Sequence, residues 1–256
     1  MIIDTHCHLN FEDFIEDIDS IFERAINQQV EKMIVIGTDH ISNLKAIQLA
    51  ETYQNFYATV GIHPGSIAEA SDFPLIIQWL THPKVVAIGE CGLDFFWTKD
   101  NKLEQINLFK KHIELAVKFK KPLVIHTRDS FSEAYETILP YKGKITGVFH
   151  CFSSHLEDAK KAIELGFYIG IDGPITYKKN EKLLNIVKDV DLMHILVETD
   201  SPYLTPHPHR GKRNEPSYLP YIIDKIAEIK GINRDEVIQI TSSNAQHLFK
   251  LTEEKL

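Results

Sequence analysis

The sequence predicts an α/β protein with a (β/α)8 TIM barrel and an extra C-terminal helix. Eight short apolar runs alternate with amphipathic segments, and most of the runs are followed directly by a histidine or a carboxylate. The length of 256 residues also suits this architecture, because an α/β barrel takes about 250 residues as one domain. We therefore treat residues 1–256 as a single barrel domain.

The eight apolar runs are short and rich in valine and isoleucine, as buried parallel strands are. They cover residues 1–4, 32–36, 56–60, 85–88, 123–125, 145–149, 167–171 and 195–197. Their alternation with helical segments predicts a parallel sheet, and eight is the number of strands that closes a barrel. An open doubly wound sheet is the alternative. It would be expected to carry a glycine-rich phosphate-binding fingerprint after an early strand, and the sequence has none.

Between the runs, apolar residues recur at spacings of three and four, which places them on one face of a helix. Examples are the sets Ile15, Ile18, Phe22 and Ile26, then Leu108, His112, Leu115 and Phe119, and then Leu183, Ile186 and Val190. Two further helical patterns, at about 218–230 and 234–250, follow the last strand. We interpret them as the eighth barrel helix and an additional one.

The composition, with 43% hydrophobic and 25% charged residues, is that of a globular protein and excludes a disordered or fibrous chain. The net charge of -8 argues against a protein that coats nucleic acid by electrostatic attraction. No apolar run approaches the roughly 18–20 residues of a membrane span, and residues 1–6 lack signal-peptide features. Three cysteines suit a reducing compartment. We expect a cytoplasmic protein without membrane association, and nothing points to an obligate protein partner.

Potential metal ligands follow six of the predicted strands. They are His6 and His8 after the first strand, His63 after the third, Glu90 after the fourth, His126 after the fifth, His150 after the sixth and Asp200 after the eighth. The carboxyl ends of barrel strands meet at one rim, where barrel enzymes carry their catalytic groups. One such histidine could be an ordinary core residue, but chance does not readily bring the whole set to one rim. The sequence therefore predicts a metal centre there.

Alternation along a strand gives the first motif a definite geometry, since residues i and i+2 face the same side. His6 and His8 can then reach one ion together, while Cys7 points the other way. The same rule turns Cys91 and Cys151 away from the ligand candidates that precede them. We interpret the three cysteines as small buried residues on the helix-facing side rather than as zinc ligands.

The four imidazoles of His6, His8, His126 and His150 and two carboxylates exceed what one tetrahedral zinc ion accepts. They suit two divalent ions about 3.5–4 Å apart, which together hold a water molecule and clamp a phosphoryl oxygen. Glu90 is the natural bridge, because a carboxylate offers one oxygen to each ion, and Asp200 can take the proton from the water. We expect magnesium or manganese, although histidine and carboxylate sites also accept zinc, nickel or cobalt.

Seven longer motifs contain these candidates. They are DTHCHL at 4–9, GIHP at 61–64, GECGLD at 89–94, HTR at 126–128, FHCFS at 149–153, ETDSPYL at 198–204 and RGKRNEP at 210–216. Together they resemble the TatD-type metal-dependent deoxyribonucleases. The resemblance implies a TIM-barrel hydrolase of the amidohydrolase-like group that cleaves DNA in the 3′→5′ direction with Mg²⁺ or Mn²⁺.

The resemblance also implies roles for individual residues. One ion would be held by His6, His8, Glu90 and Asp200, and the second by Glu90, His126 and His150. His63, Arg128 and Glu198 would lie beside the metals, near the scissile phosphate. The sequence departs from the family pattern at Gly65, at Phe96 and Trp97, and at Ser154. These departures leave every ligand in place, so they bear on substrate preference rather than on hydrolysis.

Basic residues near the predicted rim have two interpretations each. Arg128 could pair with a phosphate oxygen, since guanidinium geometry suits bidentate contacts, or it could pair with Asp129. Arg210, Lys212 and Arg213 could form a basic lip that attracts a nucleic-acid end, or a solvated loop. We assign Arg213 to substrate binding on the first interpretation.

Other residues near the predicted rim also have two interpretations each. Phe95, Phe96 and Trp97 could stack on a terminal base or pack beneath their loop. Asp94 could orient a ligand imidazole or cap a helix. Glu198 faces the barrel interior by strand alternation, so we assign it to substrate binding beside the metals rather than to a purely structural contact.

These observations predict a metal-dependent exonuclease that acts on DNA ends, preferably single-stranded ones. The alternative is a related metal hydrolase that acts on a small amide or ester. Many such barrels carry a bridging lysine after the fourth strand, where this sequence has Glu90. A non-enzymatic nucleic-acid-binding protein is the least consistent with the acidic net charge.

Overall fold

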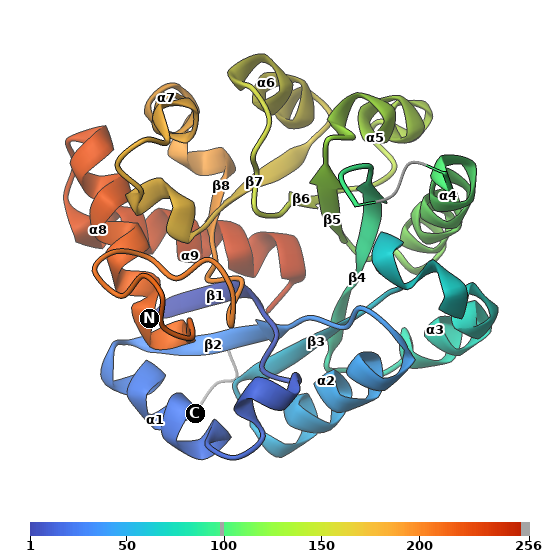
Figure 1. Ribbon diagram of the computed structural model, residues 1–256, viewed down its shortest axis with the longest axis horizontal. Coiled ribbons are helices and arrows are strands. Elements are labelled where there is room, and N and C mark those ends of the chain that lie inside the picture. The colour runs from blue at the N-terminus through green and yellow to red at the C-terminus, as the bar shows by residue number, and fades with distance from the viewer. Residues whose placement is uncertain (98–99, 252–256) are drawn as a thin grey trace.

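The computed structural model describes residues 1–97 and 100–251. Its strands form one parallel sheet in sequence order, with the helices arranged around the outside of a ring (Figure 1). The strands are β1 (Ile2–Cys7), β2 (Val30–Val35), β3 (Phe56–Val60), β4 (Val85–Asp94), β5 (Leu123–Arg128), β6 (Gly147–Phe149), β7 (Phe167–Ile171) and β8 (Ile195–Val197).

The ring closes between β1 and the segment that follows β8. Cys7 and Ser201 form a parallel bridge, and the His8 amide donates to the Ser201 carbonyl oxygen at 2.8 Å. The Asp200 amide in turn donates to the His6 carbonyl oxygen at 2.9 Å. The TIM-barrel prediction is confirmed, and the same contacts bring the first and the last metal-ligand candidates side by side.

A helix follows each strand, and one more follows the last. The helices are α1 (Ile18–Asn27), α2 (His40–Thr52), α3 (Phe73–Trp79), α4 (Lys102–Phe119), α5 (Phe131–Ile138), α6 (Leu156–Glu164), α7 (Glu181–Asp189), α8 (Leu219–Lys230) and α9 (Arg234–Phe249). Short 3₁₀ turns lie at η1 (Glu12–Phe14), η2 (Pro64–Asp72), η3 (Leu139–Tyr141), η4 (Gly173–Thr176), η5 (Leu192–His194) and η6 (Pro216–Tyr218). Within the described part of the chain, no helix is both long and apolar enough to cross a bilayer.

Several strands extend further than their apolar runs. β4 continues to Asp94 and β5 to Arg128, because the polar residues at their ends still pair in the ladder, for example Gly92 with His126. β6 is shorter than the apolar run and ends at Phe149. His6, Glu90 and His126 lie within strands, whereas the other ligand candidates lie just after the ends of theirs.

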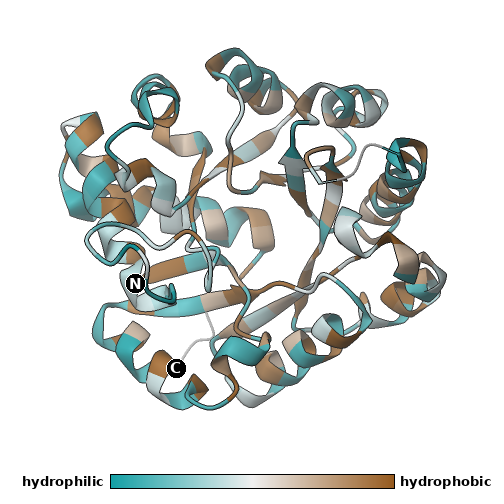
Figure 2. Ribbon diagram, viewed as in Figure 1, coloured by the Kyte–Doolittle hydropathy of each residue, from teal (hydrophilic) through white to brown (hydrophobic). Residues whose placement is uncertain are grey.

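Two apolar layers hold the barrel together. The larger one fills the space between the strands and the surrounding helices. In the second, Ile3, Val124 and Leu196 of the strands pack against Leu248 and Phe249 of α9, which runs behind the barrel in Figure 1. Figure 2 shows the strands as largely hydrophobic, with hydrophilic stretches on the surrounding helices. The extra helix thus covers one end of the barrel and leaves the carboxyl ends of the strands open.

His112, which the helical pattern placed on the inner face of α4, is a buried core residue. Its Nε2 accepts a hydrogen bond from the Ile62 amide at 3.1 Å, and its Nδ1 lies 2.9 Å from the Leu108 carbonyl oxygen. Burial lowers the pKa of His112 from 6.5 to about 4. The folded state therefore keeps this imidazole neutral at a pH where the unfolded chain protonates it.

This arrangement predicts a loss of stability in acid. The pKa of His112 is lower in the folded state than in the unfolded chain. The contribution of His112 to stability is therefore complete above pH 6.5 and is lost as the pH falls towards 4. Between pH 7 and pH 5, the free energy of unfolding of the wild type should fall by about 2 kcal/mol more than that of the His112→Gln variant. Urea denaturation in EDTA at both pH values checks this. Identical pH dependence in the two proteins would contradict it.

Candidate metal centre

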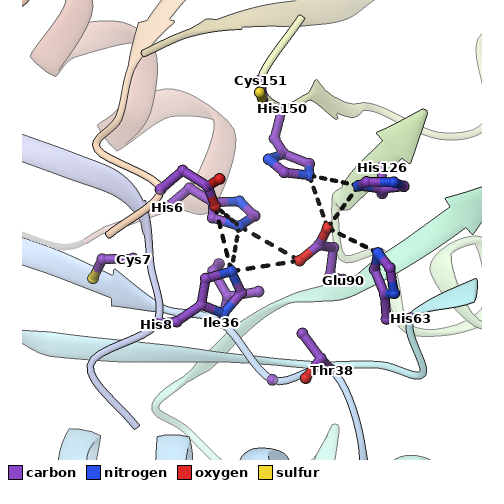
Figure 3. Close-up of polar contacts among 12 residues, drawn as sticks. His6, Cys7, His8, Ile36, Thr38, His63, Glu90, His126, His150 and Cys151 are labelled. Carbon is purple, nitrogen blue, oxygen red and sulfur yellow. Dashed lines mark hydrogen bonds and ion pairs between the residues drawn. The ribbon is translucent and has the colours of Figure 1, made fainter. Parts of the chain in front are cut away.

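Four side chains from β1, β4 and the segment after β8 converge at the open end of the barrel (Figure 3). His6 Nε2 and His8 Nε2 lie 3.2 Å apart, and each lies 3.4 Å from Asp200 Oδ1. Glu90 Oε2 lies 3.5 Å from His6 Nε2 and 3.7 Å from His8 Nε2. The first predicted ligand set is therefore brought together in space.

The other oxygen of Glu90 faces a second group of histidines. Glu90 Oε1 lies 2.8 Å from His150 Nε2, 3.1 Å from His126 Nδ1 and 3.6 Å from His63 Nε2. The two nitrogens of His126 and His150 are 3.3 Å apart. Figure 3 shows Glu90 in the middle of the histidines, as a bridge between two sets would be placed.

The local structure of β1 explains how its histidines reach the centre. The ladder between β1 and β2 shifts register between Asp4 and Cys7, so strict alternation is broken there. Asp4 is turned towards the last strand, where its carboxylate accepts hydrogen bonds from the Thr199 amide at 3.0 Å and the Thr199 hydroxyl at 2.6 Å. This buried anchor fixes the backbone from which His6 and His8 project.

The electrostatics of the cluster suit a cation. Burial alone would raise the pKa of Glu90, but His150, His63 and His126 outweigh it and hold that pKa well below its usual range. Burial also opposes ionisation of Asp200, yet its contact with His8 keeps the pKa of Asp200 below its ordinary value. Both carboxylates are therefore anionic at neutral pH although both are buried.

Two of the histidines that face Glu90 are held in the form that binds metals. Burial lowers the pKa of His6 and of His63 to about 4, so both imidazoles are neutral, which is the form that binds metals. Ligand atoms at about 2.1 Å from a tetrahedrally coordinated ion lie about 3.4 Å from one another. The spacings of 3.2–3.7 Å within the first set match this value, and the second set is similarly compact.

Comparison with known proteins gives the family. A family model described as TatD related DNase matches residues 3–250. The chain belongs to the TatD family of metal-dependent hydrolases.

Relatives within the family match along their whole length. The chain is 40% identical to YabD of Bacillus subtilis, described as an uncharacterized metal-dependent hydrolase, with 98% of this chain and 100% of that protein covered. It is 33% identical to YcfH of Escherichia coli, which has the same description, over 100% of this chain and 98% of that protein. The crystal structure of YjjV, a TatD homologue from Escherichia coli, covers 98% of both chains at 30% identity with a TM-score of 0.91.

Asp94 takes the first of the two roles considered for it in this TatD-family sequence, the orientation of a ligand imidazole, and it closes a turn rather than capping a helix, since the N-cap of α4 is Asn101. Its Oδ2 lies 2.9 Å from His126 Nε2, while its Oδ1 accepts hydrogen bonds from the Phe96 and Trp97 amides at 3.0 and 3.2 Å. Burial lowers the pKa of His126, but Asp94 and Glu90 outweigh burial and raise it to about 9. Asp94 thereby orients His126 with Nδ1 towards the centre.

We expect the Asp94→Asn variant to bind divalent metal about 10- to 100-fold more weakly, because it loses the charge that orients a ligand imidazole. Asparagine retains an oxygen that can cap the turn, whereas Asp94→Ala removes both contacts. Calorimetric titration of the metal-free proteins with Mn²⁺ measures the affinity, and thermal unfolding in EDTA separates it from stability. Wild-type Mn²⁺ affinity in Asp94→Asn would exclude the orienting role.

Glu198 lies behind the ligands rather than in the open site. It is fully buried, its Oε1 accepts a hydrogen bond from the Cys151 amide at 2.6 Å, and the same oxygen lies 4.0 Å from His150 Nδ1. A Cβ at Gly170 would come within 2.7 Å of the Glu198 carboxyl carbon, so that glycine makes room for it. This position does not support the predicted contact of Glu198 with substrate. Glu198 is instead placed to position His150.

The remaining substrate-contact candidates line a cavity of about 790 Å³ above the ligands. His63 and Arg128 lie on its wall together with Trp97. The Arg128 guanidinium stacks over the Phe96 ring, 3.9 Å from its centroid. The side chains of Phe96 and Trp97 are both exposed. Phe95 is buried and packs in the core, so only two of the three predicted aromatic residues can meet a ligand.

The predicted basic lip is divided in the structure. Arg213 pairs with Asp17 at 2.6 Å and lies over the Phe14 ring, which ties the β8–α8 segment to the β1–α1 segment. It does not line the cavity, so the predicted substrate contact of Arg213 is not supported. Arg210 instead stacks on Tyr177, 3.9 Å from the ring centroid.

The cysteines follow the prediction at two of three positions. Cys7 and Cys91 point into the helix-facing layer, where their Sγ atoms contact the carbonyl oxygens of Ile34 and Val124. Cys151 lies beyond the end of β6, with a positive φ of 45°, so strand alternation does not apply to it. Its sulfur lies near Asp172 and Asp200 on the cavity wall.

Phe11 and Asn214 are among the residues of the site that were not singled out from the sequence. Phe11 stacks on His8 with ring centroids 4.5 Å apart and forms part of the cavity wall. Asn214 is fully buried, and its amide donates to the carbonyl oxygens of Thr199 and Tyr203 at 2.8 and 2.6 Å. Asn214 lies in the RGKRNEP motif, but only its contacts with Thr199 and Tyr203 show that it supports the segment bearing Asp200.

Proposed function

We propose that the chain is a two-metal deoxyribonuclease that removes nucleotides from the 3′ ends of single-stranded DNA. The observation that carries the proposal is the position of Glu90, whose two oxygens face two separate ligand sets at the base of one cavity. His6, His8 and Asp200 would hold one ion and His126 and His150 the other, with Glu90 shared. Mg²⁺ or Mn²⁺ would serve, and zinc, nickel or cobalt ions suit the same donors.

Two divalent ions, when bound, would lower the pKa of a water molecule and stabilise charge on the phosphoryl oxygens. The residues of the chain provide the other steps. The Asp200 carboxylate, ionised at neutral pH, accepts the proton from the attacking water. His63 and Arg128 on the cavity wall donate hydrogen bonds to phosphate oxygens, for which the guanidinium fork is suited.

The shape of the cavity favours a single strand. Its volume of about 790 Å³ is in the range of sites that enclose one small ligand, which favours an unpaired strand end over a duplex. Exposed Phe96 and Trp97 offer ring faces to a terminal base, and base stacking of this kind is tolerant of sequence. We also propose a cytoplasmic location, which suits the three free cysteines.

The test is release of nucleotides from 3′-labelled single-stranded DNA with added Mg²⁺ or Mn²⁺. We expect release by the wild type, none in EDTA and none by Asp200→Asn. Asp189→Asn, an exposed position at the end of α7, is the matched control and should retain full activity. Full activity of Asp200→Asn would remove its role as the base. Turnover of small esters or amides without nucleotide release would favour the alternative hydrolase.

A further inference from the structure

The rim around the metal cavity is electrostatically uneven. The segment between β1 and α1 carries Glu12, Asp13 and Glu16, and these residues line two hollows on that side. Two arginines reach this side, and both Arg213 and Arg24 pair with Asp17. Lys45 also lines one of the hollows, where Glu12, Asp13, Asp39 and Glu69 outnumber it. A polyanionic strand would be repelled here, because like charges in a shared cleft disfavour binding.

The segments after β7 and β8 carry the opposite charge. A hollow of about 460 Å³ is lined there by Tyr177, Lys178, Lys179, Asn180, His207 and Arg210. Lys178, Lys179 and Arg210 are exposed, and the Arg210 guanidinium stacks on Tyr177. This basic hollow, as we call it, has the combination of cations and an aromatic ring that single-stranded nucleic-acid sites use.

The basic hollow adjoins the metal cavity through shared segments. Pro174 and Leu204 line the cavity, and Tyr177 and His207, three residues further along each segment, line the hollow. The two segments are tied together, since the Tyr177 hydroxyl donates to the Thr205 carbonyl oxygen at 3.2 Å. The His207 amide also donates to the Thr176 hydroxyl at 2.9 Å. The lysines and Arg210 therefore form one surface at a fixed place beside the ligands.

We propose that the basic hollow is a second subsite, which binds the phosphate backbone of the single strand whose 3′ end lies at the metal centre. This inference rests on the proposed function and adds the path of the substrate. In an eight-stranded ring β4 lies across from β8, and Figure 1 shows their loops on opposite sides of the barrel. The strand thus crosses the rim from Trp97 and Arg128 towards Tyr177 and Arg210, away from the acidic side.

The test compares Lys178→Glu/Lys179→Glu with Lys142→Glu/Lys144→Glu. The second pair makes the same charge change at two exposed positions before β6, at the opposite end of the barrel. Fluorescence anisotropy with a 5′-labelled 20-nucleotide single strand in EDTA measures binding without hydrolysis. We expect the Kd of the first variant to rise about tenfold and its log-log salt slope to fall by about 0.7 for each lost phosphate contact. The control should match the wild type.

A second readout follows catalysis. The ratio of kcat/KM for the 20-nucleotide strand to that for bis(4-nitrophenyl) phosphate should fall about tenfold in Lys178→Glu/Lys179→Glu and stay constant in the control. If no phosphodiester is hydrolysed by the wild type, the proposed function fails while the anisotropy still decides the subsite. Equal Kd values for the two charge-reversed variants, or no binding of the strand by the wild type at 50 mM salt, would overturn the subsite.

Discussion

Replacement of Glu90 by glutamine should lower metal-dependent kcat/KM by about 10³-fold or more, which corresponds to about 4 kcal/mol of transition-state stabilisation. Glu90 Oε2 lies 3.5 Å from His6 Nε2, and its Oε1 lies 2.8 Å from His150 Nε2. Glutamine keeps the shape of the side chain, but it has one acceptor oxygen and no charge. It can therefore serve one ligand set at most, and the two-ion arrangement is lost.

Metal content and thermal unfolding separate this effect from a folding defect. Metal at 100 times its Kd stabilises a folded protein by about 2.7 kcal/mol, so the wild type should unfold at a higher temperature in Mn²⁺ than in EDTA. Glu90→Gln should lose most of that increase and should bind fewer ions by elemental analysis. Glu164→Gln, at an exposed position on α6, is the control. A Glu90→Gln protein with wild-type ion content and activity would exclude the bridging role.

The positions of the ligand candidates were predictable because two geometric rules act on them. The carboxyl ends of parallel barrel strands meet at one rim, and His6 and His8 share a face of the chain. The register shift in β1 was not visible in the sequence, because it depends on the partner strand and on the buried contact between Asp4 and Thr199. The prediction of a shared site nevertheless held, since His6 Nε2 and His8 Nε2 lie 3.2 Å apart.

Glu198 shows what the alternation rule leaves out. The rule placed it on the interior side, and the structure shows it fully buried, with Oε1 bonded to the Cys151 amide. Glu198 and Asp200 both follow the end of β8, and Asp200 has a positive φ of 54°, so strand spacing does not fix their relative depth. Glu198 lies against Gly170 and the Cys151 amide, behind His150. Depth separates a residue that meets substrate from one that packs behind a ligand, and a sequence pattern does not measure it.

Loop residues were the least predictable because no periodicity constrains them. Arg210 and Arg213 are three residues apart, yet one stacks on Tyr177 and the other pairs with Asp17. Charge complementarity between segments nearly 200 positions apart decides the second contact. The sequence likewise did not decide which of the three neighbouring aromatic rings could meet a ligand. The structure shows that Phe95 is buried and that Phe96 and Trp97 are exposed.

Substitution of Gly92 by alanine should destabilise the metal-free protein by about 3 kcal/mol or more. Gly92 adopts φ of +135°, which residues with a side chain rarely adopt, and it pairs with His126 in the β4–β5 ladder. A Cβ there would overlap the backbone oxygen of His126 and come within 3.1 Å of its carbonyl carbon. Backbone strain and overpacking each cost about 1–3 kcal/mol. The same displacement would move a ligand imidazole away from Glu90.

Gly143→Ala is the matched control, since Gly143 has φ of +76° but no atom within 4 Å of the added Cβ. Its cost should be limited to the left-handed backbone, about 1–2 kcal/mol. Urea denaturation in EDTA gives both values, and titration with Mn²⁺ should show weakened binding only in Gly92→Ala. Equal destabilisation of the two variants would mean that the strands do not approach as closely as the barrel requires. A larger loss of unfolding free energy in Gly92→Ala than in Gly143→Ala would show that the close pairing of β4 and β5 both stabilises the barrel and positions His126.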